Sequence, residues 1–409
     1  MLVLKTPSVV VLLVARLVSL TGSTMTLVAL PWFVLVTTGS PARMGIVLAA
    51  QLLAVALLGI PSGVLLTALG PRRTMLLADF ARVPLMLAVP VLQWNGLLSF
   101  PLLVVLAFGI GAFRAPYGAA MNVLMPELAG EDETLVSRAN ALFQLVTQGT
   151  TIFGPILAGI LIGVLGSPTI LVVDAATFFV SGLLVLFLVH AGARAAAVPE
   201  ARGALAGLRF LRRDRLLGPL VVAAIVLGLA HDGLFGMLPV LAFERYGDAT
   251  SAGAIFAADG AGSVLGSLTV MWLVSRWPGT RLLLGAIIVM SLALWPLPVP
   301  MPLVGVAASM FVFGFASMLF VPPFVSILTL RTPAALRPKV MTAYMTMHTL
   351  AGPVGLALAG PSVQAFGLKP VFVAIAVTFT FGAAVLAIIL VKRGGAAAAA
   401  VAESVPAVA

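Results

Sequence analysis

A succession of apolar runs, each of about 20 residues, limits what this chain can fold into, because such a run is long enough to cross ~30 Å of hydrocarbon as a helix. Hydrophobic residues make up 61% of the 409 residues and charged residues only 9%. A soluble domain carries roughly 25% charged residues. The sequence therefore predicts an all-α polytopic membrane protein.

Twelve spans are predicted, separated by short connections that contain Gly, Pro, Ser or Asn. Their ranges are 8–37, 43–69, 73–94, 99–126, 137–165, 168–190, 216–245, 251–275, 280–298, 301–329, 339–366 and 369–391. One long connection, 191–215, separates an N-terminal half of six spans (1–190) from a C-terminal half of six (216–391). Its Arg-rich second part is predicted to lie as a helix on anionic lipid. The Ala-rich residues 392–409 are predicted to form a disordered tail.

Most Lys and Arg residues of the connections lie on the side that holds both termini, while Arg43, Arg245 and Lys369 lie on the opposite side. Short cytoplasmic loops are enriched in Lys and Arg, so both termini are predicted to be cytoplasmic. The net charge of +10 reflects this topology and does not indicate a nucleic-acid partner. The chain has no cysteine, and its three histidines and scattered acids lack metal-ligand spacing, so no metal or other cofactor is expected.

A Gly-Pro step recurs at the same place in the two halves. Span 137–165 contains Gly154-Pro155 followed by Gly159, and span 339–366 contains Gly352-Pro353. Gly and Pro are common in membrane helices, but here the position and the flanking pattern also agree. We interpret the halves as parallel repeats with a site between them, which is an architecture of secondary transporters.

Several motifs resemble the major facilitator superfamily. Gly63, Gly70, Arg72 and Arg73 match the signature loop between its second and third spans, and Gly154-Pro155 with Gly159 matches the antiporter motif of its exporters. Other segments resemble the branch that holds the enterobactin exporter and the macrolide efflux pumps. These segments are Ala78–Arg82, Ala115–Tyr117, Met125–Leu128, Arg138–Leu142 and Asp174–Phe178.

The signature loop departs from the family pattern at three positions. Thr67 replaces the family's Asp, Ala68 replaces a basic residue, and Pro71 replaces the first Arg. In the family that Asp pairs with an Arg of the fourth span and locks one conformation. The resemblance therefore implies a gate that is weakened or rebuilt.

The resemblance implies two six-helix halves around a cavity lined by the first, fourth, seventh and tenth spans. It implies a non-enzymatic exporter of amphiphilic or hydrophobic small molecules, such as drugs, in a bacterial inner membrane. Alternating access, proton antiport and a monomer in contact with lipid are expected. A siderophore exporter and a lysolipid or lipid translocator stay open as alternatives. A sensor or a membrane enzyme is disfavoured, because no loop is long enough for an output domain and no nucleophile–base constellation is found.

Charged residues inside spans mark candidate sites, because a charge in lipid is costly and usually faces a cavity or a partner. Arg16, Asp79, Arg82 and Arg114 are predicted to lie in the cytoplasmic half of their spans. Asp79 and Arg82 are three residues apart and share a helix face. We predict a charge cluster in which Asp79 acts in the gate. The alternative is a static Asp79–Arg82 pair.

Asp232 is predicted to be the deepest acid, mid-span and beside His231. A buried carboxyl group can alternate between protonated and charged forms, which is the chemistry of proton coupling. Asp232 and His231, with Arg16 and Arg114, are our candidates for proton coupling or substrate contact. The alternative is a neutral Asp232 held by a hydrogen bond. Asp174 and Asp259 are placed nearer the external face, in a helix-start and a helix-packing role.

Polar, aromatic and methionine side chains within spans are predicted to line the transport path. They are Thr21, Ser23, Gln144, Gln148, Phe235, Met345 and His348. Methionine offers soft, adaptable surface for varied apolar molecules. Hydroxyl groups also bond to helix carbonyls, so the set carries more weight than any one member.

Overall fold

The computed structural model describes residues 7–129, 133–189 and 204–403, and the secondary structure assigned within these ranges is helical. The N-terminal half contains α1 (Pro7–Thr38), α2 (Pro41–Leu69), α3 (Pro71–Trp94), α4 (Phe100–Ala112), α5 (Arg114–Ala129), α6 (Glu133–Leu165) and α7 (Ser167–Leu188). The C-terminal half contains α9 (Leu217–Arg245), α10 (Ala249–Leu273), α11 (Gly279–Leu294), α12 (Leu303–Arg331), α13 (Arg337–Phe366) and α14 (Leu368–Glu403). Along the chain, α8 (Ala204–Arg213) follows α7 and precedes α9, and a 3-10 turn (Ala334–Leu336) precedes α13.

The connections are tight because glycine and proline stand where the chain reverses. Gly70 ends α2 with a φ of 79°, a conformation that disfavours any residue with a Cβ. Pro71 then begins α3, where a missing N–H costs nothing. Ser40 caps α2 by accepting a hydrogen bond from the Arg43 backbone N–H at 3.2 Å.

Ten helices of the described ranges are long and apolar enough to cross a membrane. Two predicted spans are not among the ten. In span 280–298, α11 has only 16 residues. In span 339–366, α13 is long but less apolar than the ten, with many Gly, Pro, Ser and Thr residues among its apolar ones. The all-helical class is therefore confirmed, and the count of twelve stays a prediction.

Two elements differ from their predicted form. The span predicted at 99–126 is interrupted at Phe113, between α4 and α5. Pro116 explains the interruption, because it has no N–H to bond the carbonyl of Ala112 and its ring disfavours the preceding helical turn. At the other end of the chain, α14 continues to Glu403, whereas the sequence predicted disorder from residue 392. Residues 404–409 lie outside the described ranges, as does 190–203 of the long connection.

The surface of the bundle is apolar. Large side chains such as Val164, Met271 and Val304 are each more than 75% exposed. Exposed apolar patches of this extent mark contact with a membrane or a partner rather than with water. The surface supports a multi-pass membrane protein.

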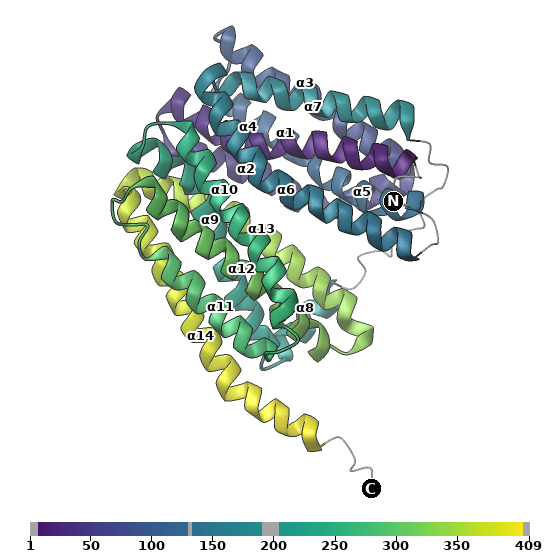
Figure 1. Cartoon of the computed structure of the whole chain (residues 1–409), viewed down its shortest axis with the longest axis vertical. Coiled ribbons are helices and arrows are strands. Elements are labelled where there is room, and N and C mark those ends of the chain that lie inside the picture. The colour runs from purple at the N-terminus through teal and green to yellow at the C-terminus, as the bar shows by residue number, and fades with distance from the viewer. Residues whose placement is uncertain (1–6, 130–132, 190–203, 404–409) are drawn as a thin grey trace.

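The two halves lie side by side as separate helical bundles, the N-terminal one purple to teal and the C-terminal one green to yellow in Figure 1. They contact each other mainly through α2 with α13 and through α6 with α10. A Cβ on Gly45 of α2 would lie 2.7 Å from the backbone oxygen of Leu356 in α13. The backbones of the two helices are therefore in direct contact at this glycine. Small residues allow such close approach in membrane helices.

These contacts gather at one end of the molecule. We call the end with the α1–α2 connection the turn end, and the opposite end, where α1 begins, the termini end. At the turn end Ser40 donates a hydrogen bond to Gln364 Oε1 of α13 at 2.5 Å. There too, a Cβ on Gly253 of α10 would lie 2.3 Å from the backbone oxygen of Pro155 in α6. The halves are therefore closed against each other at the turn end.

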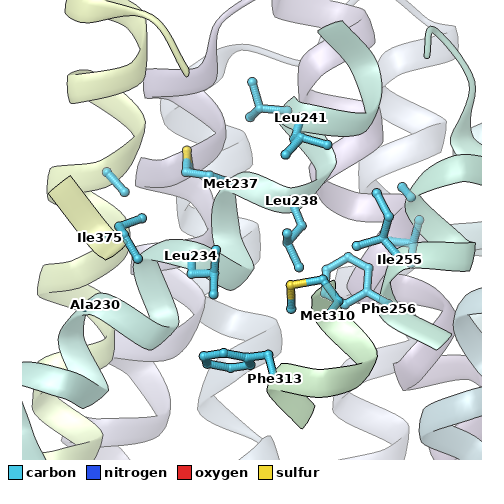
Figure 2. Close-up of a cluster of buried hydrophobic side chains, with 14 of the residues drawn as sticks. Ala230, Leu234, Met237, Leu238, Leu241, Ile255, Phe256, Met310, Phe313 and Ile375 are labelled. Carbon is cyan, nitrogen blue, oxygen red and sulfur yellow. The ribbon is translucent and has the colours of Figure 1, made fainter. Parts of the chain in front are cut away.

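The buried apolar residues form one large cluster that spans both halves and a smaller one at the termini end of the N-terminal half. Figure 2 shows the part of the large cluster around α9, where Leu234, Leu238 and Leu241 pack toward residues of α10 and α12. Phe313 of α12 lies at the edge of this cluster. The packing fixes the second half of α9 and positions the polar residues that precede it.

Candidate functional site

The central site begins at the midpoint of α9. His231 and Asp232 occupy the middle of this helix of 29 residues, as predicted. Their side chains are 38% and 27% exposed, so they face an accessible space rather than a packed core. His231 Nδ1 and Asp232 Oδ1 are 3.3 Å apart. Two adjacent titratable groups are thereby exposed in the middle of a helix that is otherwise mostly apolar.

Asp232 lies where α9 crosses the second Gly-Pro step. A Cβ on Gly352 would lie 2.5 Å from Asp232 Oδ2, and Pro353 follows directly. The same Cβ would lie 2.5 Å from Cδ2 of Leu52, a residue of α2 in the opposite half. Glycine at 352 therefore leaves room for the carboxyl group. The structure brings together Asp232, Gly352-Pro353 and the contact between halves, which the sequence did not link.

An aromatic wall surrounds His231. Its ring stacks on Phe235, with centroids 4.4 Å apart and planes 22° apart. The predicted role of Phe235 in lining the transport path stays a prediction. Phe313 of α12 lies 5.8 Å from the His231 ring and also contacts Phe379 of α14. Phe313 was missed by the sequence analysis, because nothing in the apolar run of α12 distinguishes it from the other phenylalanines there.

A second aromatic group continues this wall on α13. The His348 ring lies 5.8 Å from that of Tyr344, which in turn lies 5.2 Å from Phe324 of α12. A Cβ on Gly228 would lie 3.0 Å from His348 Nε2, so His348 faces α9 one turn before His231. His348 thus lies near the central site, and its predicted role in lining the transport path stays a prediction. Met345 is 51% exposed on the same helix.

The N-terminal half holds the second charged group, and the predicted Asp79–Arg82 pair is present. Arg82 donates to Asp79 Oδ1 at 2.6 Å, and Ser181 of α7 donates to Asp79 Oδ2 at 2.8 Å. Both charged side chains are buried, and the guanidinium lies 4.0 Å from the ring centroid of Phe178. The pair therefore ties α3 to α7 inside this half.

Arg114 lines a cavity of about 100 Å³ together with Arg82, Asp174 and Ser23. Asp174 is 1% exposed and accepts hydrogen bonds from Thr26 at 2.5 Å and Thr177 at 3.1 Å. The expectation of a helix-start position near the external face is therefore wrong for Asp174, which is enclosed between α1 and α7. Asp174 is the eighth residue of α7, beyond its first turn, and its partner Thr26 comes from a helix far away in the sequence.

Arg16 lies beside this group without joining the cavity lining. Its guanidinium is 5.1 Å from the ring centroid of Phe143 and 5.8 Å from that of Tyr117. Arg16 Nε is buried with no hydrogen-bond partner in the described ranges. The four predicted cluster residues thus lie in one region of the N-terminal half, with Asp79 and Arg82 buried, Arg16 half-buried and Arg114 exposed. Within the described part of the chain, none of them bonds to Asp232.

The remaining predicted path residues are scattered. Thr21 and Ser23 donate to the carbonyls of Leu17 and Ser19 on their own helix. On α6, Gln144 is exposed and Gln148 half-buried, and no bond of either side chain is found in the described part of the chain. Gly154 packs against Thr24 of α1, and Gly159 against the Ala249 carbonyl of α10, so the first Gly-Pro motif contributes to the contact between α6 and the neighbouring helices.

A family model described as Major Facilitator Superfamily matches residues 12–356. The chain belongs to the major facilitator superfamily. The multidrug efflux pump Tap of Mycolicibacterium fortuitum is 30% identical over 380 residues, which cover 89% of this chain and 91% of Tap. Superfamily membership confirms the family resemblance and indicates a transporter rather than an enzyme.

Solved structures agree in fold. The nucleoside transporter NupG superposes with a TM-score of 0.81 at 15% identity, over 93% of this chain and 98% of NupG. A bacterial homolog of the human lysosomal transporter Spinster, in an inward-facing and unoccupied conformation, superposes with a TM-score of 0.75 at 14% identity. The match covers 93% of this chain and 96% of that homolog. At these identities the likeness concerns the fold alone.

In this superfamily member the signature loop is built around the α2–α3 turn. Gly70 makes the turn, and Arg72 donates to the Leu186 carbonyl of α7 at 2.6 Å. Arg73 is exposed, and Gly63 has open space around its Cα. Arg72 therefore ties the loop to α7 of its own half, in a chain whose loop Asp is replaced by Thr67.

Proposed function

We propose that this chain exports drugs or other amphiphilic small molecules across a bacterial inner membrane by alternating access. The observation that carries the proposal is the partly exposed His231–Asp232 pair, which lies mid-helix beside the second Gly-Pro step, where Gly352 also approaches Leu52 of α2 in the other half. A site at the boundary of two repeats is where a rocking transporter binds its substrate. The 30% identity to the Tap multidrug efflux pump supports the substrate class.

The chemistry of the site favours an amphiphilic cation. Phe235 and Tyr344 are half-buried and offer aromatic faces, backed by the fully buried Phe313 and Phe324, and Asp232 offers a negative charge beside His231. Aromatic faces attract cations as well as apolar groups. A sugar or phosphate would need more polar partners than this wall provides.

The orientation follows from the basic connections, which favour cytoplasmic termini. The turn end is then external. Because the halves contact each other at that end, the described conformation is closed to the outside and faces inward. The Ser40–Gln364 bond and the α6–α10 contact support this assignment.

Export against a gradient needs an energy source, and proton antiport is the one that this chain's residues support. Asp232 and His231 are titratable and exposed at mid-helix, where a proton and a cationic substrate can compete for the same charge. Arg16 and Arg114 lie in the N-terminal half and act there rather than on Asp232. Asp79 with Arg82 forms the charged layer beside them.

Dye efflux from cells that lack their major pumps tests the proposal. We expect the native chain to lower ethidium retention and a protonophore to abolish this effect. Asp232→Asn should lose efflux, because it removes the charge while keeping the shape. Glu244→Gln, at the end of the same helix, is the matched control and should retain it.

Two outcomes would count against the proposal. A native chain that reaches the membrane but moves no ethidium would favour a dedicated siderophore or lipid substrate. Full efflux by Asp232→Asn would remove Asp232 from both coupling and substrate contact, and the Asp79–Arg82 layer would become the next candidate.

A further inference from the structure

Within the described ranges, four aspartates lie well inside helices, and one of them has a buried carboxyl oxygen that accepts no hydrogen bond there. They are Asp79, Asp174, Asp232 and Asp259. The first three accept hydrogen bonds or contact a histidine. Asp259 Oδ1 is buried with no hydrogen-bond partner in the described ranges. The residue as a whole is half-buried, so one carboxyl oxygen is enclosed while the group keeps access to the surrounding space. A carboxylate oxygen enclosed without a hydrogen bond disfavours the charged form, so this group is suited to hold a proton and to exchange it.

Asp259 is also deeper than its sequence position indicated. It lies near the middle of α10, which begins at Ala249 and ends at Leu273. The expectation of a shallow packing site is therefore wrong in depth, although close packing is present. A Cβ on Gly314 of α12 would lie 2.8 Å from Asp259 Oδ1. Glycine at 314 thus makes room for the carboxyl group against the backbone of α12.

The position connects the central site with the contact between halves. Gly314 directly follows Phe313, whose ring lies 5.8 Å from that of His231. On the other side, a Cβ on Gly260 would lie 3.0 Å from the Thr151 carbonyl of α6, in the opposite half. Asp259 therefore lies between the residues that hold His231 and a helix that must move when the halves rock.

Few charged groups can act on Asp259. From α9, His231 approaches through Phe313, which directly precedes Gly314, and Asp232 lies beside His231. The sequence of α12 contains no charged residue from Leu303 to Leu330, and that of α6 contains none from Ala139 to Leu165. On α10 itself Asp259 is the one charged residue, and on α1 the one charged residue is Arg16. His231 is thus the group whose movement would change the ionisation of Asp259.

We propose that Asp259 carries the exchanged proton, that Asp232 faces the substrate, and that His231 links the two carboxyl groups. This rests on the proposed function and divides its two tasks between two residues. With the substrate site empty, His231 stays beside Asp232 and Asp259 keeps its proton.

A cationic substrate at Asp232 takes the place of His231 as the partner of that carboxylate. The imidazole N–H is then free to donate to Asp259. The O–H bond of Asp259 breaks, its proton passes to water on the open side, and the resulting carboxylate accepts the bond from His231. The substrate's positive charge enters as the proton leaves, so the charge of the site is conserved.

Infrared difference spectroscopy of the purified full chain tests the proton site without any substrate. The native chain should show the carbonyl stretch of a protonated carboxyl group that disappears as pH is raised. Asp259→Asn should lack one component of this band, and Asp259→Glu should restore a shifted one. Ser263→Ala, one turn further along α10, is the control for altered packing against Gly314 and should keep the native band.

Transport in proteoliposomes tests the coupling. Asp259→Asn should exchange ethidium across the membrane without a gradient but lose accumulation driven by a pH gradient. Asp232→Asn should lose both. Loss of exchange in Asp259→Asn would overturn the proposal in favour of a structural role, and so would normal driven accumulation.

The two experiments separate this proposal from the proposed function. If native and Asp259→Asn spectra coincide, Asp259 holds no titrating proton and the proposal is wrong, whatever the chain transports. If the band is lost in Asp259→Asn but the native chain moves no ethidium, the proton site stands and the assigned substrate class fails.

Discussion

At the scale of single residues, Asp79 and Arg82 are two buried charged side chains that neutralise each other in an ion pair. Asp79 is fully buried, Arg82 is 4% exposed, and their ion pair is 2.6 Å long. Removing one partner of such a pair leaves the other charge uncompensated in a low-dielectric interior. The bond from Ser181 to the second carboxylate oxygen extends the pair to α7.

Asp79→Ala is therefore expected to lower the free energy of unfolding by about 3–5 kcal/mol, because it strands the Arg82 charge. Thermal unfolding of the purified chain in detergent would measure the loss as a lower midpoint. Arg73→Ala, at an exposed residue in the first turn of α3, should leave the midpoint unchanged. If Asp79→Ala kept its stability but lost transport, the pair would belong to a moving gate instead of a static brace.

At this scale, the sequence predicted relations between residues that are close together in the chain, but not contacts between distant residues. The 3.6-residue helical period placed Asp79 and Arg82 on one face, and the central position of Asp232 followed from the length of its apolar run. The neighbours of Asp232 could not be predicted, because Gly352 and Leu52 lie far away in the sequence and meet it only through packing. The same holds for Thr26, which encloses Asp174 from another helix.

At the scale of elements, the spans were predictable because each must cover the same membrane thickness with apolar residues. The departures have local causes. Pro116 explains the break between α4 and α5, and the sequence contained that signal. The continuation of α14 to Glu403 follows the high helix propensity of its Ala-rich end, which was interpreted as a disordered tail. In the long connection, α8 forms where an Arg-rich helix was predicted, and its contact with lipid stays a prediction.

The α6–α10 contact gives a prediction about conformation. A valine at Gly253 would collide with the Pro155 carbonyl, because even a Cβ would lie 2.3 Å from that oxygen. Gly253→Val should therefore weaken closure at the turn end and shift the population toward the opposite conformation. Spin labels on Ser40→Cys and Gln364→Cys would report a longer distance.

Gly285→Val is the matched control for this shift. It adds the same side chain to a helix of the same half at a position with open space around it. The label distance should then stay as in the parent. An unchanged distance in Gly253→Val itself would mean that the α6–α10 contact does not hold the turn end closed.

At the scale of the whole molecule, two bundles that touch mainly at one end need only a change in their mutual tilt to open one side and close the other. The contacts that must break are few and lie near the turn end, among them the Ser40–Gln364 bond and the backbone approach of Gly45 to Leu356. The central site around Asp232 borders this interface, so access to it depends on which end is closed.

A covalent lock across the turn end should therefore stop transport. The chain has no cysteine, so Ser40→Cys with Gln364→Cys introduces a single pair of thiols. In the native chain, Ser40 Oγ and Gln364 Oε1 are 2.5 Å apart. We expect oxidation of this double variant to abolish dye efflux and a reductant to restore it, because the turn end can no longer open. A second pair, Ser291→Cys with Thr380→Cys, joins α11 and α14 within one half, where the native hydroxyls are 2.7 Å apart. Cross-linking this pair should leave efflux intact, because the helices within a half move together. Undiminished efflux from the fully cross-linked Ser40–Gln364 variant would mean that the halves do not separate at the turn end, and rocking about the central site would have to be abandoned.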